Sequence, residues 1–368
     1  MFFSLAKSVD TRFPNHAPLG SWIVNHDNGW QVSDTAVVKK LTGSDQCLAP
    51  YTRLVWHGNV IDLEHSVLRG YPLWWDQDLK VLTNLAGSGE RIWADDRVRI
   101  NQDSVEVTKQ DVIGNCNLSS LTAEAATDQL TKILVGHVRH LFDCTPGRMK
   151  SHFQSGGLDN AMIRACLVKL RCDFTALDYE HFEYDWFTNQ VKDILRDNYW
   201  AYRQIHHWRD PVILLTGSCG DEYLMRGPTT IAIYCAWHDI DLVDRLQRSQ
   251  GYHVKYFLRD KNRSIIQKYW QDRSVIQRQC ADYSSLVRHI CDINANDHQH
   301  WHLGNTFTWS PFHDLNLTKL MLSLDPDVLL DHFVDATVTK QVLRNLGADP
   351  DQVLGADKNL HARAVYAS

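Results

Sequence analysis

Two glycine-rich segments of this 368-residue chain place acidic residues where a phosphate and a divalent cation could bind together. The first is Ser155–Asn160 (Ser-Gly-Gly-Leu-Asp-Asn), and the second is Thr216–Glu222 (Thr-Gly-Ser-Cys-Gly-Asp-Glu). Glycines let the backbone approach an anion closely, and its N–H groups can then bind phosphate oxygens. A carboxylate beside a bound phosphate needs a cation between them, and Mg²⁺ accepts oxygen ligands from both. The two segments therefore predict a polyphosphate site with magnesium.

The residues around both segments predict the elements that would position them. Apolar residues between Leu158 and Leu170 have the spacing of one buried helix face, so the first glycines would precede a helix N-terminus. Pro211–Leu215 is a short, unbroken apolar run, typical of a parallel strand covered on both faces. Ligands of open α/β sheets bind at the carboxyl ends of the strands. We therefore expect both glycine segments at that edge of one parallel sheet.

The residue types within the two segments indicate which groups would bind which part of the ligand. The predicted metal ligands are Asp159, Asp221 and Glu222, although Glu222 could instead cap a helix. For the first segment, a plain strand–turn–helix connection remains the alternative. The residues predicted to contact the nucleotide here are Ser155, Gly156, Gly157, Asp159, Asn160 and Gly217.

These motifs carry a resemblance to a known family. The first segment resembles the SGGxDS signature of the PP-loop ATP pyrophosphatases, and Thr216–Gly227 (TGSCGDEYLMRG) resembles the SGxGxDExxxGG segment of their asparagine-synthetase-like branch. Downstream, Ser310–Asp314 is similar to that branch's PFLD segment, and Lys340–Arg344 is similar to its KxxLR helix. The resemblance implies a PP-loop parallel-sheet fold that binds ATP and Mg²⁺.

The same resemblance implies roles for residues outside the glycines. Lys358 and Lys340 would neutralise departing pyrophosphate, and a plain surface lysine is the alternative for each. Ala176 lies in a strand expected over Phe174–Asp178 and would line the adenine pocket, with a pure core role as the alternative. Ser218 stands where many asparagine synthetases carry Glu, and it would contact the adenylate or hydrogen-bond within its own turn.

The pattern along the chain predicts two domains. Residues 1–117 predict a smaller β-rich domain, an antiparallel sheet or sandwich. A helical stripe then runs over residues 122–142, with Thr122 as its N-cap. Residues 118–368 would form an α/β domain that ends in a largely helical part. The clearest predicted strands of the first domain are residues 21–24, 53–56, 73–75 and 97–100.

The family's N-terminal domain is a glutaminase whose nucleophile is a cysteine directly after the initiator Met. This chain has Phe2 at that position. The resemblance therefore implies a degenerate amidotransferase-like domain without glutaminase activity, which would pack against the synthetase domain.

Composition narrows the class of protein and its partners. The formal net charge of −6 argues against nucleic-acid binding driven by overall charge. A local basic group around Arg259–Lys268 is best interpreted as a solvated helix face. The nine cysteines form no CxxC pair and predict small core residues of a reduced, cytoplasmic protein. No apolar run approaches the roughly 20 residues of a membrane helix, so no membrane partner is expected. A homodimer is left open.

A histidine-rich stretch, Asp297–His302, offers a different chemistry. On a strand, His298, His300 and His302 would share one face, as a transition-metal site requires. A polar role beside the substrate, and ordinary surface or core histidines, are the alternatives.

Together these observations predict an ATP-dependent ligase. A substrate carboxylate, small or peptidic, would be adenylated with release of pyrophosphate, and an amine or ammonia would then displace AMP to form an amide. One alternative is a PP-loop enzyme that activates a nucleobase carbonyl. Another is a nucleotide-binding regulatory or scaffold protein whose chemistry has decayed.

Overall fold

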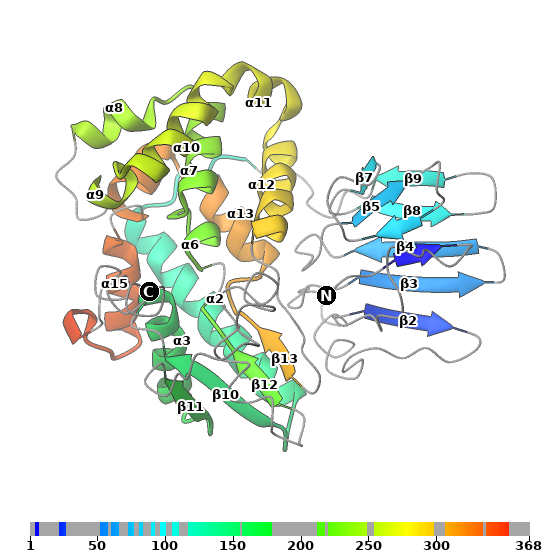
Figure 1. The fold of residues 1–368 in the computed structure, drawn as a ribbon. Coiled ribbons are helices and arrows are strands. Elements are labelled where there is room, and N and C mark those ends of the chain that lie inside the picture. Colours follow the sequence, from blue (N-terminus) through cyan, green and yellow to red (C-terminus); the bar gives the residue numbers. More distant parts are fainter. Residues whose placement is uncertain are drawn as a thin grey trace, which may run out of the picture.

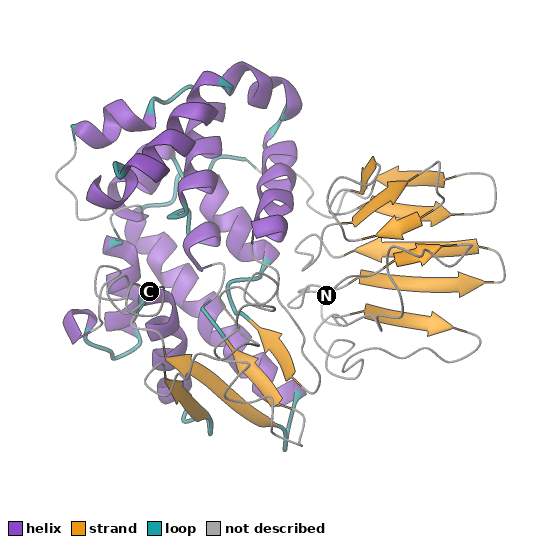
Figure 2. Ribbon diagram, viewed as in Figure 1, coloured by secondary structure: helices purple, strands orange, loops and turns teal. Residues whose placement is uncertain are grey.

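The computed structural model describes most of the chain after residue 116 and isolated strands before it. The described residues are 4–6, 22–26, 52–57, 60–65, 73–76, 81–83, 90–92, 96–100, 105–109, 117–154, 157–178, 212–217, 220–248, 254–297, 306–333 and 336–352. Within them the protein is α/β, with mostly helical content and a small parallel sheet (Figures 1 and 2).

The strands described before residue 110 form two sheets. One has the order β1-β6-β5-β7 and is antiparallel throughout, and the other has the order β2-β3-β4-β8-β9. Successive side chains of β4 point to opposite faces of the second sheet. Leu63 is buried on one face, while its neighbour Asp62 pairs with exposed Arg99 of β8 on the other. The strands are β1 Ser4–Ala6, β2 Trp22–His26, β3 Thr52–His57, β4 Val60–His65, β5 Leu73–Asp76, β6 Val81–Thr83, β7 Glu90–Ile92, β8 Asp96–Ile100 and β9 Val105–Lys109.

All four strands listed from the sequence lie at β2, β3, β5 and β8. The expectation of antiparallel pairing was wrong for one pair, since β2 runs parallel to β3. Parallel neighbours need a long crossover connection, and residues 27–51 are long enough to supply one.

The parallel sheet has the order β11-β10-β12-β13, and every neighbouring pair in it is parallel. Its strands are β10 Met149–Gln154, β11 Thr175–Asp178, β12 Val212–Leu215 and β13 Thr306–Trp309. The β12 residues Ile213, Leu214 and Leu215 are all buried, as the apolar run predicted.

The strand order reverses between β10 and β12. From β10 the chain passes to β11 on one side, and it later returns to β12 on the other side of β10. Connections that leave neighbouring strand ends in opposite directions mark the place where open α/β sheets bind ligands. Both glycine segments follow these two strands.

Three helices of this part pack on one another: α2 Ala123–Cys144, α3 Leu158–Lys169 and α15 Thr337–Asn345. The Thr122 hydroxyl accepts a hydrogen bond from the Ala125 N–H at 3.2 Å, which confirms the predicted N-cap of α2. The buried face of α2 includes Leu130, Leu134 and Val138, all members of the predicted stripe. The helix predicted over residues 158–170 is α3.

The remaining helices gather beyond the sheet. Figure 1 shows the four parallel strands at one end of this part and α7, α8, α10 and α11 at the other, with α6 between them. No described helix is long and apolar enough to cross a membrane. These helices are α6 Gly220–Tyr223, α7 Pro228–Trp237, α8 Leu242–Gln247, α9 Val254–Phe257, α10 Asp260–Gln271, α11 Arg273–Gln279, α12 Tyr283–Asp297, α13 Leu315–Ser323 and α14 Pro326–Val328, with a π-helical turn Leu329–Phe333 and a 3₁₀ turn Pro350–Gln352.

Candidate functional site

The two glycine segments touch one another at the ends of β10 and β12. The Gly217 N–H donates a hydrogen bond to the Asn160 side-chain oxygen at 2.9 Å. A Cβ added to Gly217 would lie 2.8 Å from the Asn160 backbone nitrogen, and a Cβ on Gly220 would collide with the Asp159 carboxyl group. Glycine is therefore required at both positions by the close approach of the segments.

The first segment opens a helix, as predicted. Gly157 is the N-cap of α3, makes no side-chain capping bond, and leaves Asp159 in the first turn. The first N–H groups of a helix have no partner within the helix, and the dipole favours an anion there. The N-terminus of α3 thus faces the second segment with donors that suit a phosphate.

A buried arginine joins the two segments. Nη2 of Arg226 contacts Oδ1 of Asp159 and lies 3.0 Å from Oδ1 of Asp221. The Arg226 side chain is only 3 % exposed, while that of Asp221 is 54 % exposed. One guanidinium nitrogen therefore bridges an acid from each segment, with the bridge open to solvent at the Asp221 side.

The electrostatics of this cluster are dominated by acid. Burial raises the pKa of Asp159, the charges of Asp221 and Glu222 add to the effect, and Arg226 opposes it. Burial by itself would lower the pKa of Arg226, but the charges of Asp159 and Asp221 raise it. Three carboxyl groups face one guanidinium, so the cluster has more negative charge than its resident cation neutralises.

The short helix α9 borders the acids. Burial raises the pKa of Tyr256 to about 12, and Asp221 and Glu222 contribute in the same direction. The guanidinium of Arg259 lies over the Tyr256 ring, 5.8 Å from its centre. Arg259 is exposed, as are Lys261, Arg263 and Lys268 on α10, in agreement with the predicted solvated helix face.

The end of β13 lies at the same edge of the sheet. The Thr216 N–H, just past β12, donates to the carbonyl oxygen of Trp309 at 3.0 Å. Trp309 leads into Ser310–Asp314, the segment similar to PFLD, and its His313 packs edge-on against Tyr223 of α6 at 5.1 Å. The segment similar to PFLD therefore lies beside the second glycine segment and α6.

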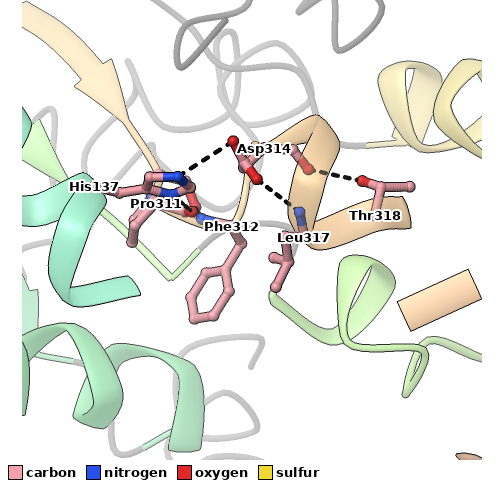
Figure 3. Close-up of polar contacts among 7 residues, drawn as sticks. His137, Pro311, Phe312, Asp314, Leu317 and Thr318 are labelled. Carbon is pink, nitrogen blue, oxygen red and sulfur yellow. Dashed lines mark hydrogen bonds and ion pairs between the residues drawn. The ribbon is translucent and has the colours of Figure 1, made fainter. Parts of the chain in front are cut away.

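A buried pair fixes this segment to α2 (Figure 3). His137 Nε2 lies 3.2 Å from Oδ2 of Asp314, and His137 Nδ1 lies 3.0 Å from the Pro311 carbonyl oxygen. Asp314 also accepts a hydrogen bond from the Leu317 N–H at 2.6 Å and so caps α13. Both ring nitrogens of His137 therefore lie close to oxygen atoms of the segment that follows β13.

Of the remaining predicted residues, Lys340 and Ala176 are described and the others are not. Lys340 is half-buried on α15, which packs against α2 and α3, and Ala176 is exposed on the edge strand β11. The predicted residues outside the described ranges are Ser155, Gly156, Ser218, Lys358, His298, His300 and His302.

The divalent cation at the acids stays a prediction, and the structure adds an arginine between them. The sequence predicted a divalent cation between Asp159 and Asp221, and in the structure the group between them is the Arg226 guanidinium. Among the described residues, no group of three or more His, Cys, Asp or Glu is arranged to hold a metal ion. One signal could have identified Arg226, because it stands where the SGxGxDExxxGG pattern has its first closing glycine.

Comparison with known proteins identifies no family for this chain. No protein-family model matches the chain, and no curated protein matches it.

Proposed function

We propose that this protein binds ATP with Mg²⁺ at the ends of β10 and β12 and uses it to adenylate a substrate carboxylate. The observation that carries the proposal is the contact between Gly217 and Asn160, which brings the two glycine segments together where the strand order reverses. The PP-loop resemblance supplies the reaction class. We further propose that an amine or ammonia completes an amide.

The residues at the site fit a metal-bound triphosphate. The first N–H groups of α3 have no partner within the helix and suit phosphate oxygens, and the glycines let the backbone approach them closely. Asp159 and Asp221, which approach one Arg226 nitrogen, would hold Mg²⁺ as a pair, and Glu222 stays a predicted further ligand; the ion when bound would neutralise charge on the phosphates. Two carboxylates, from Asp159 and Asp221, approach the same Arg226 nitrogen, which supports a site where a cation binds between the two segments.

The proposed reaction has two steps. The carboxylate oxygen bonds to the α-phosphorus as the bond from that phosphorus to the β-phosphate oxygen breaks, and pyrophosphate leaves. The amine nitrogen then bonds to the acyl carbon, AMP leaves, and the nitrogen loses a proton. Lys340 and Lys358 remain the proposed cations for pyrophosphate, and Ser218 the proposed contact to the adenylate. Asp314 and His137 would act as positioning residues, because they fix the segment after β13.

Calorimetric titration with Mg-ATP, followed by an assay of pyrophosphate release, tests this function. We expect binding by the wild-type protein and a loss of at least about tenfold in affinity for Asp159→Asn, because a metal ligand and its charge are removed. Glu124→Gln is the matched control, since Glu124 is also an acid in the first turn of a helix but lies on α2. A wild-type protein that binds no nucleotide would contradict the proposal.

One observation favours a second candidate, a nucleotide-binding protein without catalysis. Arg226 bridges Asp159 and Asp221, the two acids that would bind Mg²⁺ in a catalytic site. Such a protein would bind ATP in the titration but release no pyrophosphate with any carboxylate. The two assays therefore separate the candidates.

A further inference from the structure

Arg226 occupies the point where both acids of the site can reach one cation. Its Nη2 contacts Asp159 and lies 3.0 Å from Asp221, so a single nitrogen atom serves both carboxylates. As the proposed metal ligands, the same two carboxylates would have to turn from Arg226 to Mg²⁺. The guanidinium nitrogen and the metal cannot occupy that space together.

The backbone holds Arg226 in this position. Met225 adopts a left-handed conformation with φ of 59°, which costs about 1 kcal/mol for a residue other than glycine. The N–H groups of Arg226 and Gly227 then donate to the Asp221 carbonyl oxygen at 2.6 and 2.8 Å. The turn after α6 thus ties Arg226 to the residue whose carboxylate its side chain binds.

We propose that Arg226 is a built-in competitor of the divalent cation, which holds the two acids together in the ligand-free protein and must leave them before a metal can bridge them. The proposal rests on the proposed function, since it takes Asp159 and Asp221 as the metal ligands. It assigns Arg226 a role in regulating metal entry that the sequence motifs do not describe.

Charge and burial explain why the guanidinium leaves only for another anion. A buried guanidinium without an acceptor is strongly disfavoured, so free metal alone gives Arg226 no new partner. A triphosphate does, because arginine binds phosphate oxygens through two parallel N–H groups. Nε of Arg226 is buried and makes no hydrogen bond within the described residues, so one such donor is available. Metal and triphosphate are therefore expected to bind together.

Mn²⁺ binding without nucleotide tests this proposal. We expect Arg226→Gln to bind Mn²⁺ at least about tenfold more tightly than wild type at pH 8, measured by electron paramagnetic resonance of free Mn²⁺, because a positive charge beside the ion is removed. Arg226→Lys retains the charge but loses the planar fork, and we expect an intermediate gain. Arg245→Gln is the control, because Arg245 also bridges two acids, Asp327 and Asp331, on an exposed surface.

The outcomes separate this proposal from the proposed function. Equal Mn²⁺ affinity in wild type and Arg226→Gln overturns the competition, and an equal gain in Arg245→Gln overturns its assignment to this site. If Arg226→Gln does not fold, as judged by circular dichroism, Arg226→Lys decides alone, and a wild-type affinity in that variant overturns the proposal. ATP binding with unchanged Mn²⁺ affinity would remove only the competition, while a gain without ATP binding would remove only the function.

Discussion

Two arginines within the described residues bridge pairs of aspartates, and they differ in burial. Arg245 Nη2 lies 3.1 Å from Asp327 and 2.9 Å from Asp331, and its side chain is 40 % exposed. Arg226 has the same arrangement of one nitrogen between two carboxylates, but its side chain is 3 % exposed. Water can replace every partner of Arg245, whereas the buried guanidinium of Arg226 depends on the two acids in the ligand-free protein.

The comparison separates a surface contact from a candidate site. Exposed ion pairs contribute at most about 1 kcal/mol, because water and salt screen them. A buried ion pair contributes little net stability when intact, but breaking it leaves an unpaired charge. We therefore expect the group around Arg226 to respond to a new ion or ligand more strongly than the exposed group around Arg245.

The largest expected effect is the loss of the buried bridge. Arg226→Gln should lower the free energy of unfolding by about 3–5 kcal/mol, because Asp159 is left without its cation, and Arg245→Gln by no more than about 1 kcal/mol. Urea unfolding of both variants measures the difference. Equal losses would mean that the Arg226 bridge is as well solvated as the one at Arg245.

The caps of two helices extend the comparison to single acids. Asp314 caps α13 while facing His137 in the interior, and Asp241 caps α8 through a hydrogen bond exposed to solvent. We expect Asp314→Ala to cost about 3 kcal/mol, because it removes the cap and leaves His137 facing no carboxylate, and Asp241→Ala to cost about 1 kcal/mol. Thermal unfolding with matched denaturant curves tests the order, and a smaller loss for Asp314→Ala would contradict it.

Burial also changes the pKa of a histidine, His152, and with it the pH dependence of stability. Burial lowers the pKa of His152 on β10 to about 4 from 6.5, although Nδ1 donates to the Leu215 carbonyl oxygen at 3.2 Å. Between these two values the unfolded chain binds a proton that the folded protein does not, so stability should rise with pH from about 4 to 6.5 and then level off.

The contribution of His152 can be isolated by substitution. His152→Asn keeps a donor for the Leu215 carbonyl group and has no group that titrates in this range. Its unfolding free energy should therefore lose up to about 3 kcal/mol of the rise seen in wild type. Urea unfolding at several pH values compares the two slopes. Parallel curves would show that His152 does not cause the acid sensitivity.

The sequence predicted those parts of the molecule whose signals are local. The apolar run of β12, the stripe and N-cap of α2, and the glycines before α3 each lie within one segment, and each element is found as expected. Parallel pairing of β2 with β3 was not predicted, because it depends on how a long connection crosses the sheet and not on the strands themselves.

The sequence marks Arg226 only as a departure from the SGxGxDExxxGG pattern and does not give the position of its side chain. That position depends on the left-handed turn at Met225 and on burial beside Asp159, which is 67 residues away in the chain. No periodic pattern encodes such a contact. The glycine motifs predicted a site rich in acids and phosphate donors, and only the fold shows which cation stands among them.

The smallest effect is expected for a substitution at Gly220, which tests how closely the two glycine segments approach one another. A methyl group on Gly220 would enter the Asp159 carboxyl group, whereas a methyl group on Gly136, within α2, meets nothing within 4 Å. We expect Gly220→Ala to destabilise the protein by about 1–3 kcal/mol through this clash. Gly136→Ala should stabilise it by about 0.5–1 kcal/mol, because alanine favours the helix. Chemical denaturation of both variants gives the sign of each effect, and a neutral Gly220→Ala would mean that the acids of the two segments lie farther apart than Arg226 can bridge.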